Sequence, residues 1–250
     1  MMQLKKSLGQ HFLKDENIIR KIIDVVKEEE YTRLLEVGPG GGALTKHLLQ
    51  LPYEQFKAVE LDDEKVSYLL QAYPTLKDNI IAQSFLDIDA PFKDAFTVIG
   101  NFPYNISTQI LFKILDWKEQ VPVVIGMFQK EVAERAASKE GSKVYGVLSV
   151  LVQAYYDVEY LFDVPPGCFN PPPKVMSAVI RLRRKNEDLP LKSEKAFKLL
   201  VKTAFNQRRK TLRNAVKSLF MPDVLQDELF NKRAEALSVA DFAALSFRMQ

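Results

Sequence analysis

The stretch Arg33-Leu-Leu-Glu-Val-Gly-Pro-Gly-Gly-Gly42 decides the fold class of this chain. Residues 33–37 form a short apolar run that predicts a buried strand. The glycines of residues 38–42 permit positive φ angles and a close approach of the backbone to a ligand. A helix is expected over residues 43–51, so the stretch predicts a strand, a tight turn and a helix in succession.

An acidic residue follows this turn at an informative distance. Glu60 ends a second expected strand, residues 56–60, and stands twenty residues beyond Gly40. An acid in that position accepts hydrogen bonds from the hydroxyls of a ribose. The glycine loop and Glu60 together indicate a cofactor that contains a nucleoside, and they fit a nicotinamide dinucleotide as well as S-adenosylmethionine.

Strands and helices continue to alternate through the first 185 residues. This alternation predicts an α/β fold with a mostly parallel sheet and helices on both faces. Further strands are expected over residues 79–83, 96–100, 121–128, 154–164 and 177–182, and helices over residues 17–30, 62–73, 106–115, 129–138 and 145–153.

Charge and pattern change toward the C terminus. Residues 174–217 hold 14 Lys and Arg against 3 Asp and Glu, whereas the remainder holds 21 basic against 29 acidic residues. Such an asymmetry favours a surface that faces nucleic acid, although charge runs are also common on solvated helix faces. We expect domains at residues 1–185 and 186–250, the second all helical with helices at 193–207, 211–220, 225–230 and 242–249.

Composition excludes several classes of protein. Of the 250 residues 47% are hydrophobic, which is enough for a substantial core, yet no apolar run approaches the length of a membrane span. The single cysteine, Cys168, fits a reducing cytoplasm, and the start of the chain lacks an apolar signal core. His11 and His47 have no partners at ligand spacing, so we expect no metal site.

Asn101-Phe102-Pro103-Tyr104 follows the fourth expected strand and precedes a helix. In open α/β sheets ligands bind at such junctions. The segment offers an amide, a backbone carbonyl and a flat ring, which suit a planar base with an exocyclic amine. A plain turn is the alternative for these four residues. A dehydrogenase commonly has His or Lys here. The segment instead resembles the (D/N)-x-P-(Y/F) motif of methyltransferases that modify amino groups of nucleobases, and this resemblance favours methyl transfer over hydride transfer.

Several stretches resemble the bacterial family of small-subunit (16S) ribosomal RNA adenine-N6,N6-dimethyltransferases. They run in order over nearly the whole chain and comprise residues 6–13, 35–42, 58–62, 100–108, 129–135, 141–146, 170–175 and 204–214. The resemblance implies a Rossmann-like methyltransferase sheet with a small helical domain that binds RNA. It also implies S-adenosyl-L-methionine as cofactor and dimethylation of two adjacent adenosines near the 3′ end of 16S rRNA.

The resemblance further implies roles for individual residues. Asn101, Pro103 and Tyr104 would hold the target adenine, with Phe169 packing on its other side. Arg208, Arg209, Lys210 and Arg213 would contact RNA phosphates. The cofactor would be bound by Gln10, His11, Leu13, Gly38, Gly40, Glu60, Ser84, Phe85 and Asn101.

The chain departs from the family pattern at two of these positions. Ser84 stands where the family usually has an Asp that bonds the adenine amine of the cofactor, and Asp87 or Asp89 could substitute for it. His11 stands where many relatives carry Asn. We expect these departures to affect cofactor binding more than the chemistry.

The resemblance implies a cytoplasmic monomer that acts on 16S rRNA in the immature small ribosomal subunit. Three alternatives stay open. The first is the related 23S rRNA adenine methyltransferase of macrolide resistance, against which residues 170–174 and 205–214 speak. The second is a ribosome assembly factor whose RNA binding matters more than its catalysis. The third is a nicotinamide dehydrogenase.

Overall fold

The computed structural model describes residues 11–250. Contacts between residues group the chain into two compact units, one formed by the chain up to Ala133 with Glu159–Arg184, the other by Glu134–Val158 with Lys185–Gln250. Residues 134–158 therefore pack with the C-terminal helices. The domain boundary expected between residues 185 and 186 stays a prediction.

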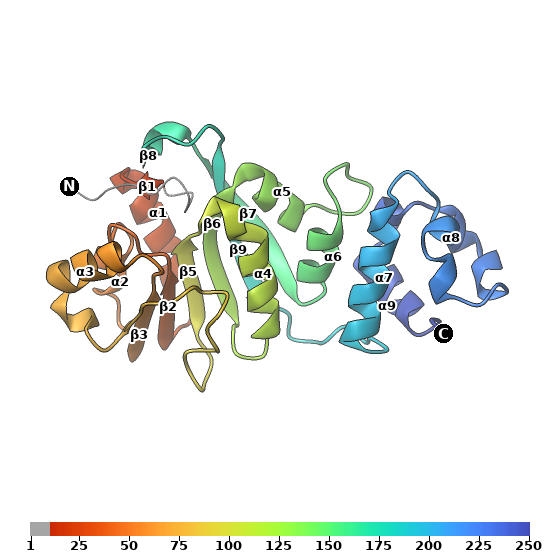
Figure 1. Ribbon diagram of the computed structural model, residues 1–250, viewed down its shortest axis with the longest axis horizontal. Helices are drawn as coiled ribbons and strands as arrows, with labels where there is room; N and C mark the ends of the chain where they lie inside the picture. The colour runs from red at the N-terminus through yellow and green to blue at the C-terminus, as the bar shows by residue number, and fades with distance from the viewer. Residues whose placement is uncertain (1–10) are drawn as a thin grey trace. The chain divides into compact units, whose positions relative to one another are not determined.

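The first unit is built on a mixed sheet (Figure 1). Its strand order is β4-β3-β2-β5-β6-β9-β7 in the described chain. The pairs β4–β3, β3–β2, β2–β5 and β5–β6 are parallel, and β9 is antiparallel to β6. The strands are β2 (Arg33–Val37), β3 (Gln55–Val59), β4 (Ile80–Ile81), β5 (Thr97–Asn101), β6 (Val123–Gln129), β7 (Tyr156–Val164) and β9 (Ser177–Arg184).

Helices flank this sheet because its central strands are apolar on both faces. Residues 123–128 of β6 are all buried, which is typical of a parallel strand covered on both sides. Helix α1 packs its isoleucines on one face, and α4 covers the other (Figure 1). The helices of this unit are α1 (Glu16–Lys27), α2 (Thr45–Leu48), α3 (Asp63–Ala72) and α4 (Ser107–Asp116), and α5 (Lys130–Ala137) crosses the boundary between the units.

Helix α1 begins where its sequence predicts. The Asp15 carboxylate accepts hydrogen bonds from the backbone N–H groups of Asn17 and Ile18, which caps the first turn. The apolar residues of α1 recur at helical spacing, so they form one stripe that is buried against the sheet.

Strand order explains where a site can form. From β2 the chain moves outward to β3 and β4, and then returns to the other side of β2 as β5. The carboxyl ends of β2 and β5 are therefore neighbours at the point where the direction of strand order reverses. A crevice opens at such a point. It brings the loop after Val37 next to the loop after Asn101.

The second unit is helical in its C-terminal part. Ser193 caps α7 through the N–H of Ala196, and Ser238 forms a reciprocal capping box with Asp241 at the start of α9. Its helices are α6 (Val147–Gln153), α7 (Glu194–Asn206), α8 (Leu212–Ala215) and α9 (Val239–Ser246).

Four expected elements are markedly shorter in the structure. The helix expected at 43–51 is the four-residue α2. The strand expected at 79–83 is the two-residue edge strand β4. The helix expected at 211–220 is α8 followed by a single 3-10 turn, and that at 225–230 is two 3-10 turns, 224–226 and 228–231. The Asp227 carboxylate accepts the N–H of Leu229 and so starts a new turn instead of continuing the previous one.

One pairing was not predicted. Strand β1 (Phe12–Leu13) pairs antiparallel with β8 (Phe169–Asn170), which closes a small second sheet. The N–H of Lys14 extends the pairing by donating to the Cys168 carbonyl at 2.9 Å. Each of these strands has only two residues, which is too short for an alternation of apolar and polar residues to be visible in the sequence.

Candidate active site

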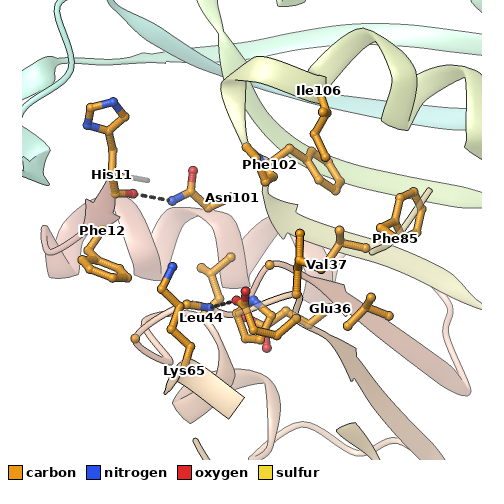
Figure 2. A pocket seen from close by; sticks show the side chains of 18 of the residues that line it. His11, Phe12, Glu36, Val37, Leu44, Lys65, Phe85, Asn101, Phe102 and Ile106 are labelled. Carbon is orange, nitrogen blue, oxygen red and sulfur yellow. Dashed lines mark hydrogen bonds between the residues drawn. The ribbon is translucent and has the colours of Figure 1, made fainter. Parts of the chain in front are cut away.

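A cavity of about 300 Å³ lies at the carboxyl ends of β2, β3 and β5 (Figure 2). Segments that are distant in the sequence line it: the chain before α1, the glycine loop after β2, the end of β3, the turn after β4 and the loop after β5. The lining residues fall within 11–13, 36–44, 59–65, 83–86 and 101–106. Each of these segments except the first follows a strand of the parallel sheet.

The glycine loop adopts a backbone that most side chains would strain. Gly38 and Gly40 have φ angles of +68° and +56°. A Cβ on Gly40 would also lie 3.2 Å from the ring of Phe12. The glycines therefore allow the loop to turn sharply and allow Phe12 to lie directly against it.

Glu60 braces this loop from the end of β3. Its Oε2 accepts a hydrogen bond from the Gly40 N–H at 3.1 Å, and its Oε1 accepts one from the Asp62 N–H at 3.0 Å. The side chain is buried yet lines the cavity. Each carboxylate oxygen can accept a second hydrogen bond, so Glu60 can hold the loop and still receive the hydroxyls of a ligand.

Glu36 is a lining residue to which the sequence analysis assigned no role. It is 1% exposed, and its Oε2 accepts a 2.7 Å hydrogen bond from the Thr45 hydroxyl. Burial raises the pKa of Glu36 to about 8, the hydrogen bond from Thr45 opposes this rise, and the neighbouring Glu60 adds to it. The signal available in the sequence was an acid two residues before the first glycine of the loop.

Asn101 is held by the chain that precedes α1. Its Nδ2 donates to the backbone carbonyl of His11 at 3.0 Å (Figure 2). An amide that uses its nitrogen in this way presents its oxygen to a ligand, so Asn101 is oriented as a hydrogen-bond acceptor. His11 is in turn tied to the β8 segment, because its Nδ1 lies 2.9 Å from the Pro171 carbonyl and a carbonyl only accepts.

The loop after Asn101 is anchored by a buried ring. The Phe102 ring lies 4.8 Å from that of Phe128, centroid to centroid, and Phe102 is 1% exposed. A Cβ on Gly126 would come within 2.2 Å of the Phe102 ring, so β6 has room for this ring only because residue 126 is glycine. The Phe102 N–H donates to the Met127 carbonyl at 3.1 Å, which fixes the backbone of the loop.

The two neighbouring carbonyls of this loop differ. Pro103 O accepts from the Ser107 hydroxyl at 3.0 Å and from the Ile106 N–H at 3.3 Å. No other described residue donates a hydrogen bond to the Phe102 carbonyl. Of these two carbonyls, that of Phe102 is the one left for a ligand.

Tyr104 is half-buried beside His11. The two ring centroids are 5.3 Å apart with 32° between the planes, and the Tyr104 hydroxyl is hydrogen-bonded to the Ser177 hydroxyl. Burial raises the pKa of Tyr104, and the hydrogen bond to Ser177 opposes that rise. The phenol therefore stays neutral at physiological pH and is fixed by contacts at its hydroxyl and on its ring.

The turn after β4 places Ser84 and Phe85 on the cavity. The Ser84 hydroxyl accepts the Leu86 N–H at 3.2 Å, and Phe85 packs edge-on against Trp117. Asp87 and Asp89 are exposed and lie outside the lining residues. Neither carboxylate therefore takes the place that Ser84 holds.

Lys65 and Phe12 are lining residues that the sequence analysis missed. Lys65 on α3 is 3% exposed, and its Nζ lies 5.0 Å from the centroid of the Phe12 ring (Figure 2). This cation–π contact joins α3 to β1 across the glycine loop. No local pattern in the sequence predicts this contact, since the two residues meet only in the folded chain.

Phe169 does not have the position expected for it. Its side chain is 1% exposed, belongs to the hydrophobic core with Leu13 and Val164, and is outside the cavity lining. The β1–β8 pairing accompanies this inward placement of the ring, and the expected role of Phe169 as the second stacking surface stays a prediction. Leu13 and His11 do line the cavity, and Gln10 lies outside the described residues.

The chain is similar to known proteins over almost its whole length. A family model described as ribosomal RNA adenine dimethylase matches residues 1–249. The chain belongs to the ribosomal RNA adenine dimethylase family. It is 52% identical to the ribosomal RNA small subunit methyltransferase A of Cytophaga hutchinsonii, with 98% of this chain and 96% of that protein covered, and 51% identical to that of Flavobacterium johnsoniae, with 100% and 97% covered.

Solved structures agree with this family and its fold. A dimethyladenosine transferase from Plasmodium falciparum superposes with a TM-score of 0.82 at 26% identity, covering 96% of this chain and 99% of that chain. The 23S rRNA methyltransferase ErmE superposes with a TM-score of 0.72 at 22% identity, covering 95% and 99%, and shows the same fold. The expected α/β methyltransferase fold is confirmed.

In this adenine dimethylase the basic residues expected to contact RNA lie in the second unit. Arg209 and Lys210 are exposed. Arg208 donates from Nη2 to two backbone carbonyls, and Arg213 donates from Nε to the Leu225 carbonyl at 2.9 Å. Part of the positive charge of residues 174–217 is instead used in the first unit, where Arg181 and Arg183 pair with Glu29.

Within residues 11–250, no group of three or more His, Cys, Asp and Glu side chains is placed to hold a metal ion. No helix in that part of the dimethylase is both long and apolar enough to cross a membrane.

Proposed function

We propose that this chain transfers methyl groups from S-adenosyl-L-methionine to the N6 atoms of two adjacent adenosines near the 3′ end of 16S rRNA. Family membership and the 52% identical small subunit methyltransferase A support the reaction and the substrate. The observation that carries the mechanism is the hydrogen bond from Asn101 Nδ2 to the His11 carbonyl, which orients the amide as an acceptor.

The cavity suits a cationic nucleoside cofactor. Glu60 would receive the ribose hydroxyls, the loop at Gly38 and Gly40 would lie against the methionine portion, and Ser84 and Phe85 would flank the adenine. When bound, S-adenosyl-L-methionine supplies a methyl group that is already activated by a sulfonium cation. The Glu60 carboxylate on the cavity wall favours such a positive ligand, and a bound cation favours the ionised form of the neighbouring Glu36 carboxyl.

The protein then has to make the adenine amine nucleophilic. The N6 lone pair is delocalised into the ring, so the amine is a poor nucleophile. Asn101 Oδ1 and the Phe102 carbonyl would accept its two hydrogens, which favours a tetrahedral nitrogen and frees the lone pair. Catalysis then rests on placement and electrostatics.

A dedicated base is not needed in this scheme. The methylated N6 is a strongly acidic ammonium and loses its proton to water. A neutral amide at residue 101 also suits two successive transfers, because one acceptor contact can be released after the first methyl group is attached. Tyr104 would stack on the adenine, which has to leave its own stack to reach the site.

Asn101→Ala tests the assignment. We expect this variant to lose methyl incorporation into unmethylated small subunits. Its RNA affinity should stay within twofold of the parent, because residue 101 lies in the first unit and is far in the sequence from the basic residues near the C terminus. Near-normal incorporation by this variant would refute the role of Asn101.

The substrate is tested separately. The protein and labelled S-adenosyl-L-methionine are offered to small and large ribosomal subunits, and the modified adenosines are mapped. Label confined to adjacent adenosines of the small subunit is expected, whereas label in the large subunit would favour the 23S alternative. Maturation of small subunits with the Asn101→Ala protein would reveal an assembly role independent of catalysis.

A further inference from the structure

The loop between α5 and α6 has no role in the site described above. It spans residues 138–146 and includes the stretch Gly141-Ser-Lys-Val-Tyr-Gly146. Lys139, Lys143 and Val144 are exposed, while Tyr145 is fully buried. The loop thus offers two cations to solvent and is rooted in the second unit by one aromatic side chain.

Arg208 ties this loop to the segment between α7 and α8. Its Nη2 donates to the Lys143 carbonyl at 3.0 Å and to the Tyr145 carbonyl at 3.1 Å. All three residues belong to the second unit, where the two connecting segments are therefore in direct contact (Figure 1). A charged donor between two carbonyls fixes the direction of the chain at residues 143–145.

Aromatic packing supports the same contact. The Arg208 guanidinium carbon lies 6.0 Å from the centroid of the Phe205 ring, and the Tyr145 ring lies 6.0 Å from the same ring. A second tie lies farther along the loop, where the Gly141 N–H donates to the Glu235 carbonyl at 2.7 Å. The loop is consequently held at residues 141, 143 and 145.

The contact places exposed cations on two neighbouring segments of the second unit. The Lys143 carbonyl accepts from Arg208, and the exposed Arg209 and Lys210 follow Arg208 directly in the chain, while the exposed Glu140 is the one acid of residues 139–146. Within residues 11–250 no carboxylate forms an ion pair with Lys143, Arg209 or Lys210. Cations that are exposed, close together and not neutralised by acids are typical of a surface that binds nucleic-acid phosphates.

We propose that residues 139–146 and 208–210 form one RNA-docking surface, in which Lys143 contacts a phosphate and Arg208 acts chiefly as the residue that positions the loop. This inference rests on the proposed RNA substrate. It adds a second segment to the basic residues expected from the sequence, and it changes the role of Arg208 from phosphate ligand to support.

Lys143→Ala is the direct test. The affinity of the full chain for unmethylated small subunits is measured at several salt concentrations. We expect a severalfold loss of affinity and a decrease of about one in the slope of log K against log salt, because one phosphate contact is removed. Lys195→Ala is the matched control, since Lys195 is an exposed lysine at the opposite end of α7.

The positioning role of Arg208 is tested by combining variants. If Arg208 holds Lys143 in place, the double variant should lose less RNA affinity than the product of the fold-losses of Arg208→Ala and Lys143→Ala. Amide hydrogen exchange of residues 139–146 should also rise in Arg208→Ala, which loss of a phosphate contact alone would not produce. Thermal unfolding of each variant checks that the chain is folded.

The outcomes separate this inference from the proposed function. Wild-type affinity and slope in Lys143→Ala would overturn the docking surface, and multiplicative losses with unchanged exchange would overturn the role of Arg208. In both situations adenosine methylation by the parent protein would still stand. Absence of any methyl transfer by the parent would instead refute the proposed function.

Discussion

At the scale of single residues, the Glu36 carboxyl is exceptional. It is buried, and no cationic side chain among the described residues is hydrogen-bonded to it. The hydrogen bonds that oppose the rise in its pKa come from the hydroxyl and the backbone N–H of Thr45, which are both neutral groups. Burial therefore keeps the proton on Glu36 up to a pH of about 8. A cationic cofactor would favour the ionised form of Glu36, so the charge of the cavity wall depends on pH and on the bound cofactor.

Glu36→Gln should change how stability depends on pH. The pKa of Glu36 is raised in the folded state, so the folded chain holds this proton between the ordinary value of 4.5 and about 8 while the unfolded chain has lost it. The contribution of Glu36 to stability consequently falls as pH rises through this window, by at most about 1.4 kcal/mol per pH unit. Glutamine removes this slope and still accepts the Thr45 hydrogen bond.

The measurement is the urea midpoint of both proteins at pH 5.5 and pH 8. The glutamine variant should gain stability relative to the parent as pH rises. Equal pH dependence in the two proteins would show that Glu36 ionises normally in the folded chain.

Ser84→Asp probes the other unusual residue of the cavity. An Asp at this position can accept the Leu86 N–H as Ser84 does and still offer a second oxygen to an amine donor. We expect turnover to be intact and cofactor affinity to be unchanged or up to about fivefold higher, since a charged acceptor adds about 1 kcal/mol. Calorimetric titration with S-adenosyl-L-methionine measures this, and a clear loss of affinity would show that residue 84 does not face the cofactor.

At the scale of elements, the loop after β5 depends on strand β6. The Phe102 ring occupies space left by Gly126, and the same loop carries Asn101 and Tyr104. The position of the two site residues is thus set by packing between neighbouring strands and not by the loop alone.

Gly126→Ala should disrupt this packing. The added methyl group would lie 2.2 Å from Phe102 and 2.6 Å from Phe128, and neither ring has free space to move into. We expect a loss of about 1–3 kcal/mol in the free energy of unfolding and a lower rate of methyl transfer in the protein that remains folded.

Gly167→Ala is the matched control for this substitution. Gly167 is in the same unit, and a Cβ there would meet nothing within 4 Å. Thermal unfolding and single-turnover methylation are compared for the two variants. Equal stability of both would show that β6 adapts to the extra methyl group.

At the scale of the whole molecule, positive charge is divided between two uses. Arg181 is buried in the first unit among Glu28, Glu29 and Glu159, so its charge is neutralised. In the second unit Lys143, Arg209 and Lys210 remain exposed. The net charge summed over residues 174–217 therefore overestimates the positive charge that is available to bind RNA.

The salt dependence of RNA binding follows from this division. If about three or four phosphates are contacted, log K should fall with log salt with a slope of roughly −2 to −3. The affinity of the parent protein for small subunits should then drop roughly 16- to 64-fold between about 50 and 200 mM salt. Filter binding at several salt concentrations measures the slope, and an affinity independent of salt would show that the basic residues do not face RNA.

The sequence by itself determined the fold class and one side of the cavity. The glycine loop, Glu60 and Asn101 each follow a strand whose apolar run is visible in the sequence, and parallel strands bring their carboxyl ends to one edge of the sheet. Local chemistry also set the caps at Asp15, Ser193 and Ser238, because those contacts span only two or three residues.

The tertiary structure alone decided the contacts between distant segments. The β1–β8 pairing buries Phe169 and brings the His11 carbonyl to Asn101, ninety residues away in the chain. Lys65 meets Phe12, and Arg208 meets the loop at Lys143, without any local pattern that predicts it. Such contacts depend on which surfaces the sheet and helices bring together, and a sequence period reports burial but not the identity of the neighbour.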